Sequence, residues 1–196
     1  DNKIPISGHN PNNCLELIKK KLINKKTIIF VNTRAQSELL FKDLFLISDK
    51  LILGIHHGSL SKKHRFNTEK LFSENKMDAI ISTSSLELGV DWKNVDQIIN
   101  VGTPKNINRL IQRTGRSNHS YYGVPISYLI PTNKFEYLEC ISAKQLAEKM
   151  DYEKIRERIG SKDVLCQHLL LLACNKGFRE LDSFNEIKKV FSYKDL

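Results

Sequence analysis

Residues 27–38 of this chain, TIIFVNTRAQSE, decide its fold class. The run from 27 to 31 is apolar, which is typical of a strand that is buried on both faces. Asn32 and Thr33 interrupt the run, and from Arg34 to Ile47 apolar residues recur at helical spacing. A buried strand that leads directly into a helix indicates an α/β fold, with a parallel sheet and helices on both faces.

The same alternation continues on both sides of this stretch. A helix is expected before it, over about residues 13–23. After it, strands are expected over 51–56, 79–82, 97–101 and 124–130, and helices over 61–75 and 107–112. Ligands of parallel sheets bind in the loops beyond the carboxyl ends of the strands, so we expect the functional residues there.

The composition changes after about residue 153, so we divide the chain into residues 1–152 and 153–196. From Asp163 the sequence DVLCQHLLLLACNKG is helical, with Gly177 as a candidate C-cap, and residues 185–191 are expected to form a second short helix. This tail has too little apolar surface to be stable alone. The chain starts at Asp1 without Met, and we expect it to be part of a longer protein.

The net charge of +9 and the pI of about 9.3 favour a polyanionic partner, of which nucleic acid is the commonest. A lysine-rich solvated surface is the alternative. We expect no membrane partner, because no stretch approaches the length of a transmembrane helix. The cysteines have no zinc-site spacing, so we predict no metal site and mostly buried, reduced thiols at Cys14, Cys140, Cys166 and Cys174.

The loop after the first strand contains Thr33 and Arg34 at the start of a helix. Helix-start amides together with an arginine are suited to binding a phosphate. An ordinary turn with Thr33 as N-cap is the alternative.

The second loop has the sequence HHGSLS at residues 56–61. Gly58 permits a partner to approach the backbone closely. The hydroxyls of Ser59 and Ser61 suit either phosphate oxygens or helix caps, and this loop alone favours caps.

The third loop, STSSLELGVDW at 82–92, places hydroxyl side chains directly after a buried strand. Hydroxyls such as those of Thr83 and Ser84 can hold a nucleic-acid phosphate, and Asp91 can hold a ribose hydroxyl. A long capped loop with Trp92 in the core is the alternative.

The fourth loop, QRTGRSNH at 112–119, carries Arg113 and Arg116 at one helix end. Burying both cations without a nearby carboxylate would be costly, and a polyphosphate partner would resolve that cost. The geometry is that of an arginine finger, with surface salt bridges as the alternative.

The segments IIFVNTRAQSE, HHGSLS, ISTSSLELGVDW and IQRTGR stand in the order and spacing of motifs IV, IVa, V and VI of superfamily 2 helicases. The chain therefore resembles the second RecA-like lobe of such a helicase. HHGSLS, SSLELGVDW, VGTPK and GRSNH are similar to the large-helicase-related group. PTNKFEYLEC and DVLCQHLLLLAC resemble its bacterial ligase-associated DEXH-box branch, and the likeness runs over nearly the whole chain.

The resemblance implies that two RecA-like lobes sandwich ATP with Mg²⁺, while single-stranded nucleic acid crosses both. Arg116 would be the arginine finger and Arg113 would help to couple the lobes, while His119 stands where a second finger is possible. The nucleotide would meet Gly89, Asp91, Gln112, Arg113 and Arg116, of which the last three are the expected catalytic residues. The strand would meet Thr33, Arg34, Gly58, Ser59, Thr83 and Ser84.

The sequence contains neither a P-loop nor a Asp-Glu-x-His motif, so this chain would hold half of an active site and be inactive alone as an ATPase. The Mg²⁺ ligands are expected in the missing first lobe, and the tail resembles the start of a winged-helix domain. The family further implies single-stranded DNA with RNA left open, 3′–5′ movement, DNA repair, ligase-associated repair proteins as partners, and a bacterial cytoplasmic location at the nucleoid. A non-catalytic nucleic-acid-binding module and a nucleotide-binding enzyme unrelated to nucleic acid are the alternatives.

Overall fold

The computed structural model describes residues 4–8, 11–48, 50–87, 92, 94–118, 123–151 and 160–194. The chain forms two compact units, residues 1–153 and 154–196. None of the helices in the described parts is long and apolar enough to cross a membrane.

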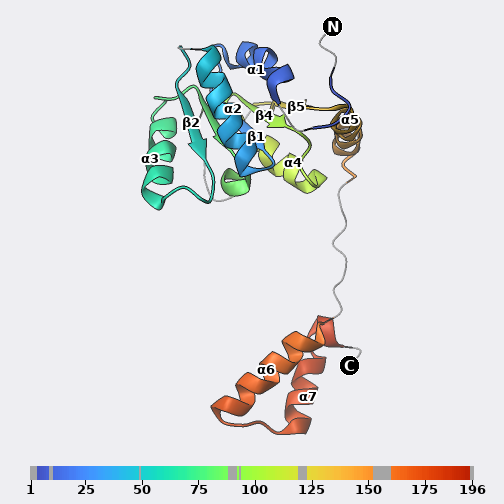
Figure 1. The fold of residues 1–196 in the computed structure, drawn as a ribbon. Helices are drawn as coiled ribbons and strands as arrows, with labels where there is room; N and C mark the ends of the chain where they lie inside the picture. Colours follow the sequence, from blue (N-terminus) through green and yellow to red (C-terminus); the bar gives the residue numbers. More distant parts are fainter. Residues whose placement is uncertain are drawn as a thin grey trace. The chain divides into compact units, whose positions relative to one another are not determined.

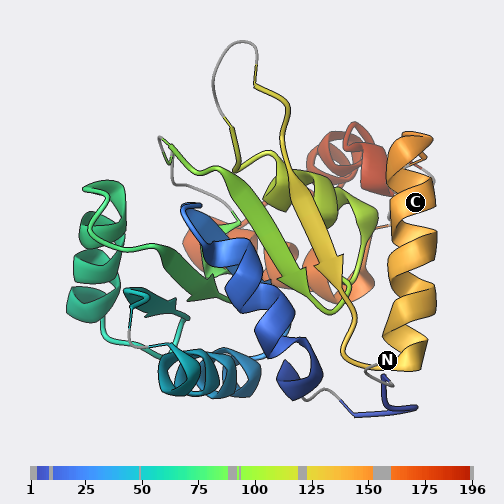
Figure 2. The same ribbon diagram turned by 90° about the horizontal axis from the view of Figure 1, so that it is seen from above.

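The first unit is built around a five-stranded parallel sheet of order β2-β3-β1-β4-β5 (Figures 1 and 2), which confirms the predicted α/β class. The predictions for β1, β3 and β4 are confirmed to the residue, whereas β2 and β5 begin later than predicted. Pro125 lacks an amide N–H and cannot join a hydrogen-bond ladder, so β5 begins after it. The strands are β1 (Thr27–Val31), β2 (Leu53–His56), β3 (Ala79–Ser82), β4 (Gln97–Val101) and β5 (Ser127–Ile130).

The three inner strands β1, β3 and β4 bury both of their faces, because successive side chains point to opposite sides of the sheet. In β1, Ile29 and Val31 face one core, whereas Ile28 and Phe30 face the other. The strands β3 and β4 alternate in the same way. Helices α1 (Leu15–Leu22) and α2 (Arg34–Ile47) cover the first core, and α3 (Lys62–Ser73) and Trp92 cover the second.

Most helices of this unit begin at a polar residue that follows a strand. The side chains of Thr33, Ser61, Asn106 and Asn133 each accept a hydrogen bond from a backbone amide of the first turn. The remaining helices are α4 (Ile107–Thr114), α5 (Lys134–Glu148) and the short 3₁₀ helices η1 (Pro11–Cys14) and η2 (Ser84–Leu86). Helix α5 was not predicted, although the cap residue Asn133 was a sequence signal for it.

The second unit contains α6 (Lys162–Asn175), α7 (Glu180–Lys188) and the 3₁₀ helix η3 (Phe191–Tyr193). Gly177 has a φ of +72° and its amide donates to the carbonyl of Leu172, so it closes α6 as predicted. Helix α7 begins and ends earlier than predicted, because acidic residues in its first turn and Lys188 in its last suit the helix dipole.

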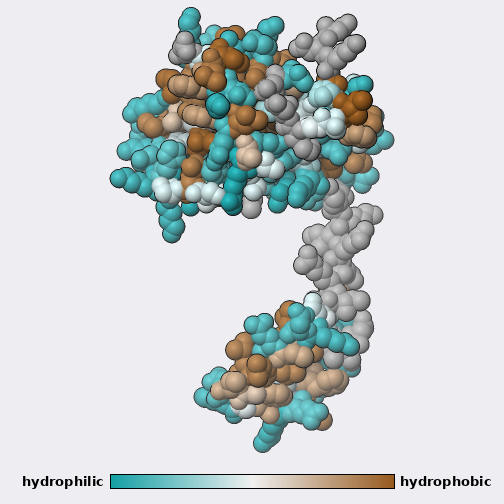
Figure 3. Space-filling view, viewed as in Figure 1, coloured by the Kyte–Doolittle hydropathy of each residue, from teal (hydrophilic) through white to brown (hydrophobic). Residues whose placement is uncertain are grey.

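Few side chains of the second unit are buried. Among its described residues only Ser183 is buried, and hydrophobic side chains lie on its surface (Figure 3). The prediction that the cysteines are mostly buried is therefore wrong for Cys166 and Cys174, because α6 has no buried face. Cys14 and Cys140, in the first unit, are buried.

We expect Leu40→Ala to lower the free energy of unfolding by about 2–5 kcal/mol, because it leaves a cavity in the core. The Leu40 side chain is fully buried between α2 and the sheet. Leu46→Ala is the matched control, because Leu46 lies on the same helix and is 67% exposed; a change within about 0.5 kcal/mol is expected. Urea unfolding followed by circular dichroism measures both, and equal losses would contradict this orientation of α2.

Candidate functional site

The loops that follow β2, β3 and β1 lie side by side at the carboxyl edge of the sheet. These strands are parallel neighbours, and in their register Ser82 lies between His56 and Phe30. Because neighbouring strands are about 4.8 Å apart, the residues just beyond these positions form a narrow strip. The six residues that were predicted to contact a nucleic-acid strand lie in this strip, and each is exposed or half-exposed: Thr33, Arg34, Gly58, Ser59, Thr83 and Ser84.

The first loop of this strip is fixed by a capping box at the start of α2. The Gln36 amide donates to the Thr33 hydroxyl (3.2 Å), and the Gln36 side chain accepts from the Thr33 amide (3.1 Å). The N-cap interpretation of Thr33 is therefore confirmed. Arg34 is exposed at the first helical position beyond this cap.

The second loop leaves space above its glycine. A Cβ atom built on Gly58 would meet no protein atom within 4 Å, so a partner has room to approach the backbone. Ser61 is an N-cap, since its hydroxyl accepts from the His64 amide (3.2 Å). The two serines of this loop therefore differ, because Ser59 is exposed and does not cap α3.

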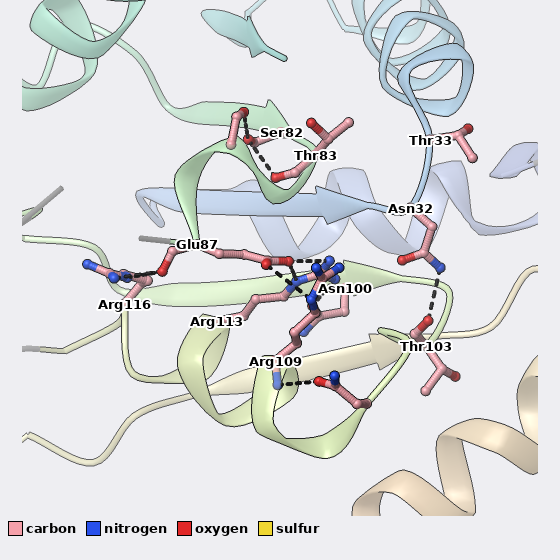
Figure 4. A network of polar contacts seen from close by, with 12 residues as sticks. Asn32, Thr33, Ser82, Thr83, Glu87, Asn100, Thr103, Arg109, Arg113 and Arg116 are labelled. Atoms are coloured by element: carbon pink, nitrogen blue, oxygen red, sulfur yellow. Dashed lines mark hydrogen bonds and ion pairs between the residues drawn. The ribbon is translucent and has the colours of Figure 1, made fainter. Parts of the chain in front are cut away.

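The third loop is tied to the end of β2. The Thr83 amide donates to the carbonyl of His56 (3.3 Å). The Ser82 hydroxyl donates to the Thr83 carbonyl (2.9 Å), as Figure 4 shows. Ser84 then opens η2, so Thr83 and Ser84 occupy a tight turn held at its base by hydrogen bonds.

His56 is the buried polar residue beside this turn. Its Nδ1 atom lies 2.7 Å from the Ser85 hydroxyl and its Nε2 atom lies 2.7 Å from Glu69 Oε1. Burial lowers the pKa of His56; Glu69 acts in the opposite direction, whereas Arg65 and His57 lower the pKa further. The imidazole is therefore neutral near pH 7 in the folded chain.

Helix α4 and the loop that follows it bring three arginines, Arg109, Arg113 and Arg116, to one glutamate, Glu87. The buried Arg113 guanidinium binds the Glu87 carboxylate through Nε (2.8 Å) and Nη2 (2.7 Å), and donates to Asn100 Oδ1 (3.1 Å; Figure 4). It also lies 4.8 Å from the centre of the Phe30 ring. Arg109 approaches the second carboxylate oxygen at 3.6 Å. Burial lowers the pKa of Arg113, and the Glu87 carboxylate opposes this.

This pairing corrects the sequence argument, which assumed that the arginines have no carboxylate nearby. Glu87 belongs to the same LEL segment as the predicted loop, but sequence reasoning did not single it out. Arg116 lies beyond the end of α4 rather than on it. Gly115 has a φ of −63°, so its turn does not require glycine.

Arg116 meets the backbone of Glu87 instead of its carboxylate. Its Nε and Nη2 atoms donate to the Glu87 carbonyl at 3.1 and 2.6 Å, and its side chain is half-buried (Figure 4). Glu87 therefore contacts Arg113 and Arg116 through different atoms. Glu87 is also separated from Thr83 by one short helix, η2, so one segment joins the strip to the arginines.

The remaining predicted nucleotide contacts lie elsewhere. Gln112 is exposed on α4. Gly89 and Asp91, together with His119, lie outside the described residues.

The donor set present suits a polyphosphate but not a magnesium ion. Arg116 and the exposed Gln112 offer N–H donors that can bind phosphate oxygens. No cluster of His, Cys, Asp or Glu among the described residues could hold a metal ion. An open groove of about 1010 Å³ lies beyond β4 and β5, between Thr103, Asn106 and α5, and it is lined by none of the predicted site residues.

We expect Glu87→Gln to destabilise the chain by about 3–5 kcal/mol, because it leaves the buried Arg113 cation without its carboxylate. Glu74→Gln is the control, since Glu74 pairs with Lys76 at the surface (2.7 Å) and such pairs contribute about 0–1 kcal/mol. Urea unfolding of both variants checks the difference. A loss at residue 87 no larger than at residue 74 would show that the Glu87–Arg113 pair does not hold this region together.

The buried His56 makes stability depend on pH. Its folded pKa is lowered below that of the unfolded chain, about 6.5. As the pH falls through that value the unfolded chain binds more protons than the folded one, so stability decreases. We expect the melting temperature to fall more steeply between pH 7.5 and 5.5 in the native chain than in His56→Gln. Parallel slopes would contradict the prediction.

Known proteins are similar to this chain in sequence and in fold. The family described as helicase conserved C-terminal domain matches residues 10–119. The chain is 35% identical over 179 residues to ATP-dependent helicase Lhr-Core of Methanocaldococcus jannaschii, covering 90% of this chain and 21% of that protein. It is 30% identical to Lhr helicase/uracil glycosylase of Escherichia coli over 76% of this chain and 10% of that protein.

A solved structure of Mycobacterium smegmatis helicase Lhr, bound to ssDNA and AMP-PNP, matches with a TM-score of 0.86 and 25% identity. It covers 98% of this chain and 27% of the Lhr chain. The chain thus spans only about a fifth of the Lhr-Core relative. Its parallel sheet is the RecA-like fold of helicase C-terminal domains, and the chain belongs to the helicase conserved C-terminal domain family.

Proposed function

We propose that this chain is the second motor lobe of an ATP-dependent helicase or translocase that acts on single-stranded DNA. The observation that carries the proposal is the segment from Thr83 to Glu87. Its first residues form part of the exposed strip, and its last residue contacts both arginines of the fourth loop. One short segment therefore touches the two sites that such a motor must couple.

The strip supplies half of a strand-binding groove. Its exposed hydroxyls, helix-start amides and Arg34 are donors suited to phosphate oxygens, which are the same for every base. The net charge of +9 favours the same partner. The Mycobacterium smegmatis relative, which was solved with ssDNA, supports DNA as the strand.

Arg116 is the proposed arginine finger. Its planar guanidinium is half-exposed and can form two parallel hydrogen bonds to a phosphate. ATP bound with Mg²⁺ would supply the phosphoryl group for hydrolysis, with the Mg²⁺ ligands and P-loop in a first lobe. Arg113 is buried against Glu87, so we assign it to positioning α4 and coupling the lobes. The chain alone is then inactive as an ATPase.

The finer assignments rest on the sequence resemblance. We propose 3′–5′ movement, a role in DNA repair, and membership of the ligase-associated DEXH-box branch with ligase-associated repair proteins as partners. We assign Gly89 and Asp91 to the nucleotide, and the second unit to the start of a winged-helix domain. The names of the relatives support an ATP-dependent helicase of the Lhr type.

We expect Arg116→Ala, in the longer protein that carries both lobes, to lower strand-stimulated ATPase turnover by a factor on the order of 10³. The charge of Arg116 acts mainly in the transition state, so affinity for a single strand without nucleotide is largely retained. Arg116→Lys should restore little, because an ammonium cannot reproduce the two-pronged contact. Steady-state ATPase and fluorescence anisotropy with a labelled strand measure the two effects.

The reciprocal variant is Arg34→Ala, on the strip. It should weaken binding of single-stranded DNA. It should also make the slope of log affinity against log salt shallower by about the amount that one phosphate contact contributes. If Arg116→Ala instead lost affinity for single-stranded DNA as strongly as it lost turnover, Arg116 would be a contact to the DNA phosphate backbone. The chain would then be a non-catalytic nucleic-acid-binding module.

A further inference from the structure

We propose that His56 is a positioning residue which, with Glu69 and Ser85, fixes the Thr83–Ser84 turn relative to the loop that contains Gly58. This inference rests on the proposed binding of a strand at this edge. Neither His56 nor Glu69 needs to touch the strand, because they act through the turn. The chemical class of ligand that they position is the phosphate backbone of a single strand.

The three side chains form a continuous relay across three elements. Glu69 lies on α3, His56 ends β2 and Ser85 lies in η2. The two links that join them through the imidazole are both 2.7 Å long. The relay therefore connects the helix that follows the Gly58 loop to the turn that follows β3.

The proton positions in the relay follow from the acceptor at one end. A carboxylate accepts and does not donate, so His56 Nε2 carries the proton that is directed at Glu69. The neutral imidazole then accepts at Nδ1, and the Ser85 hydroxyl donates to it. A hydrogen bond to a charged group is stronger than a neutral one, so Glu69 fixes both the tautomer and the ring orientation.

His56 holds the turn through its backbone as well. Its carbonyl accepts from the Thr83 amide (3.3 Å) and faces the Ser85 hydroxyl (3.2 Å). The His56 side chain is only 2% exposed, in a place where an apolar residue would fill the space without needing partners. A buried polar network that is fully hydrogen-bonded holds one geometry more strictly than apolar packing does.

The order Ser–His–Glu also occurs in nucleophilic enzymes, but the Ser85 hydroxyl is occupied here. It lies within 3.2 Å of His56 Nδ1, of the His56 carbonyl and of Ser82 Oγ. A hydroxyl has one proton, and all three neighbours are acceptors for it, because Nδ1 is unprotonated, a carbonyl only accepts and the Ser82 hydroxyl already donates to the Thr83 carbonyl. The Ser85 proton is therefore engaged within the protein. The geometry therefore supports positioning of the turn rather than attack on a substrate.

Substitution of Glu69 tests the inference, because electrostatics and positioning predict opposite signs. Removing an acidic residue near a bound polyanion should tighten binding. If Glu69 positions the turn, Glu69→Ala should weaken binding of a labelled oligo-dT strand by about threefold to tenfold, the effect of one lost hydrogen bond. Glu69→Gln keeps an acceptor oxygen for Nε2 and should stay within about twofold of the native chain.

Glu74→Ala is the matched control. Glu74 directly follows α3 and is also acidic, but it pairs with Lys70 and Lys76 away from the relay. Its loss should leave affinity unchanged or slightly increased. Ser85→Ala breaks the relay at its other end and should reproduce the loss seen in Glu69→Ala, whereas Ser85→Thr keeps the hydroxyl and should restore binding. Melting temperatures of all variants confirm that they are folded.

A second readout does not need the strand. Hydrogen exchange of the Thr83 amide, followed by NMR, should be faster in Glu69→Ala and Ser85→Ala and unchanged in Glu69→Gln and Glu74→Ala. Unchanged exchange in all variants, or tighter strand binding by Glu69→Ala, would overturn the inference. If the native chain bound no strand at all, the proposed function would fail, and the exchange rates would still decide whether the relay holds the turn.

Discussion

The buried ion pair between Glu87 and Arg113 is the interaction on which the functional half of this structure depends. Taking two charges out of water is costly, and the cost is offset only when the geometry is good and further hydrogen bonds are made. Here two guanidinium nitrogens meet one carboxylate oxygen, Asn100 accepts from a third nitrogen, and Phe30 lies against the cation. The pair therefore joins α4 and β4 to the segment that carries the third loop.

This ion pair places the turn proposed to contact DNA and the residue that contacts the proposed arginine finger on one short segment, from Thr83 to Glu87. The turn at Thr83 and Ser84 is part of the strip, and the carbonyl of Glu87 accepts hydrogen bonds from Arg116. The turn is connected to the residue that contacts Arg116 through the single short helix η2. The proposed His56 relay stiffens the other end of the same segment, so both of its ends are held by buried polar contacts.

The sheet provides the fixed framework from which these loops extend. Its inner strands are buried on both faces, which leaves the loops at the carboxyl edge as the places where polar residues can meet a ligand. The second unit is built differently, because its described helices leave most of their apolar side chains exposed. The described residues of the second unit therefore do not form a buried hydrophobic core.

The sequence by itself determined the α/β class, strands β1, β3 and β4, and where the loops after β1, β2 and β3 begin, because the periodicity of apolar residues and the residues next to strand ends are local properties. It did not identify Glu87 as the partner of Arg113, because residues 26 positions apart meet only when the strand order β1-β4 and the path of α4 bring them together. The contact between His56 and Ser85, 29 positions apart, likewise depends on β2 and β3 being neighbours. Local sequence can show that a residue is polar and close to a strand end, but its partner is decided by tertiary packing.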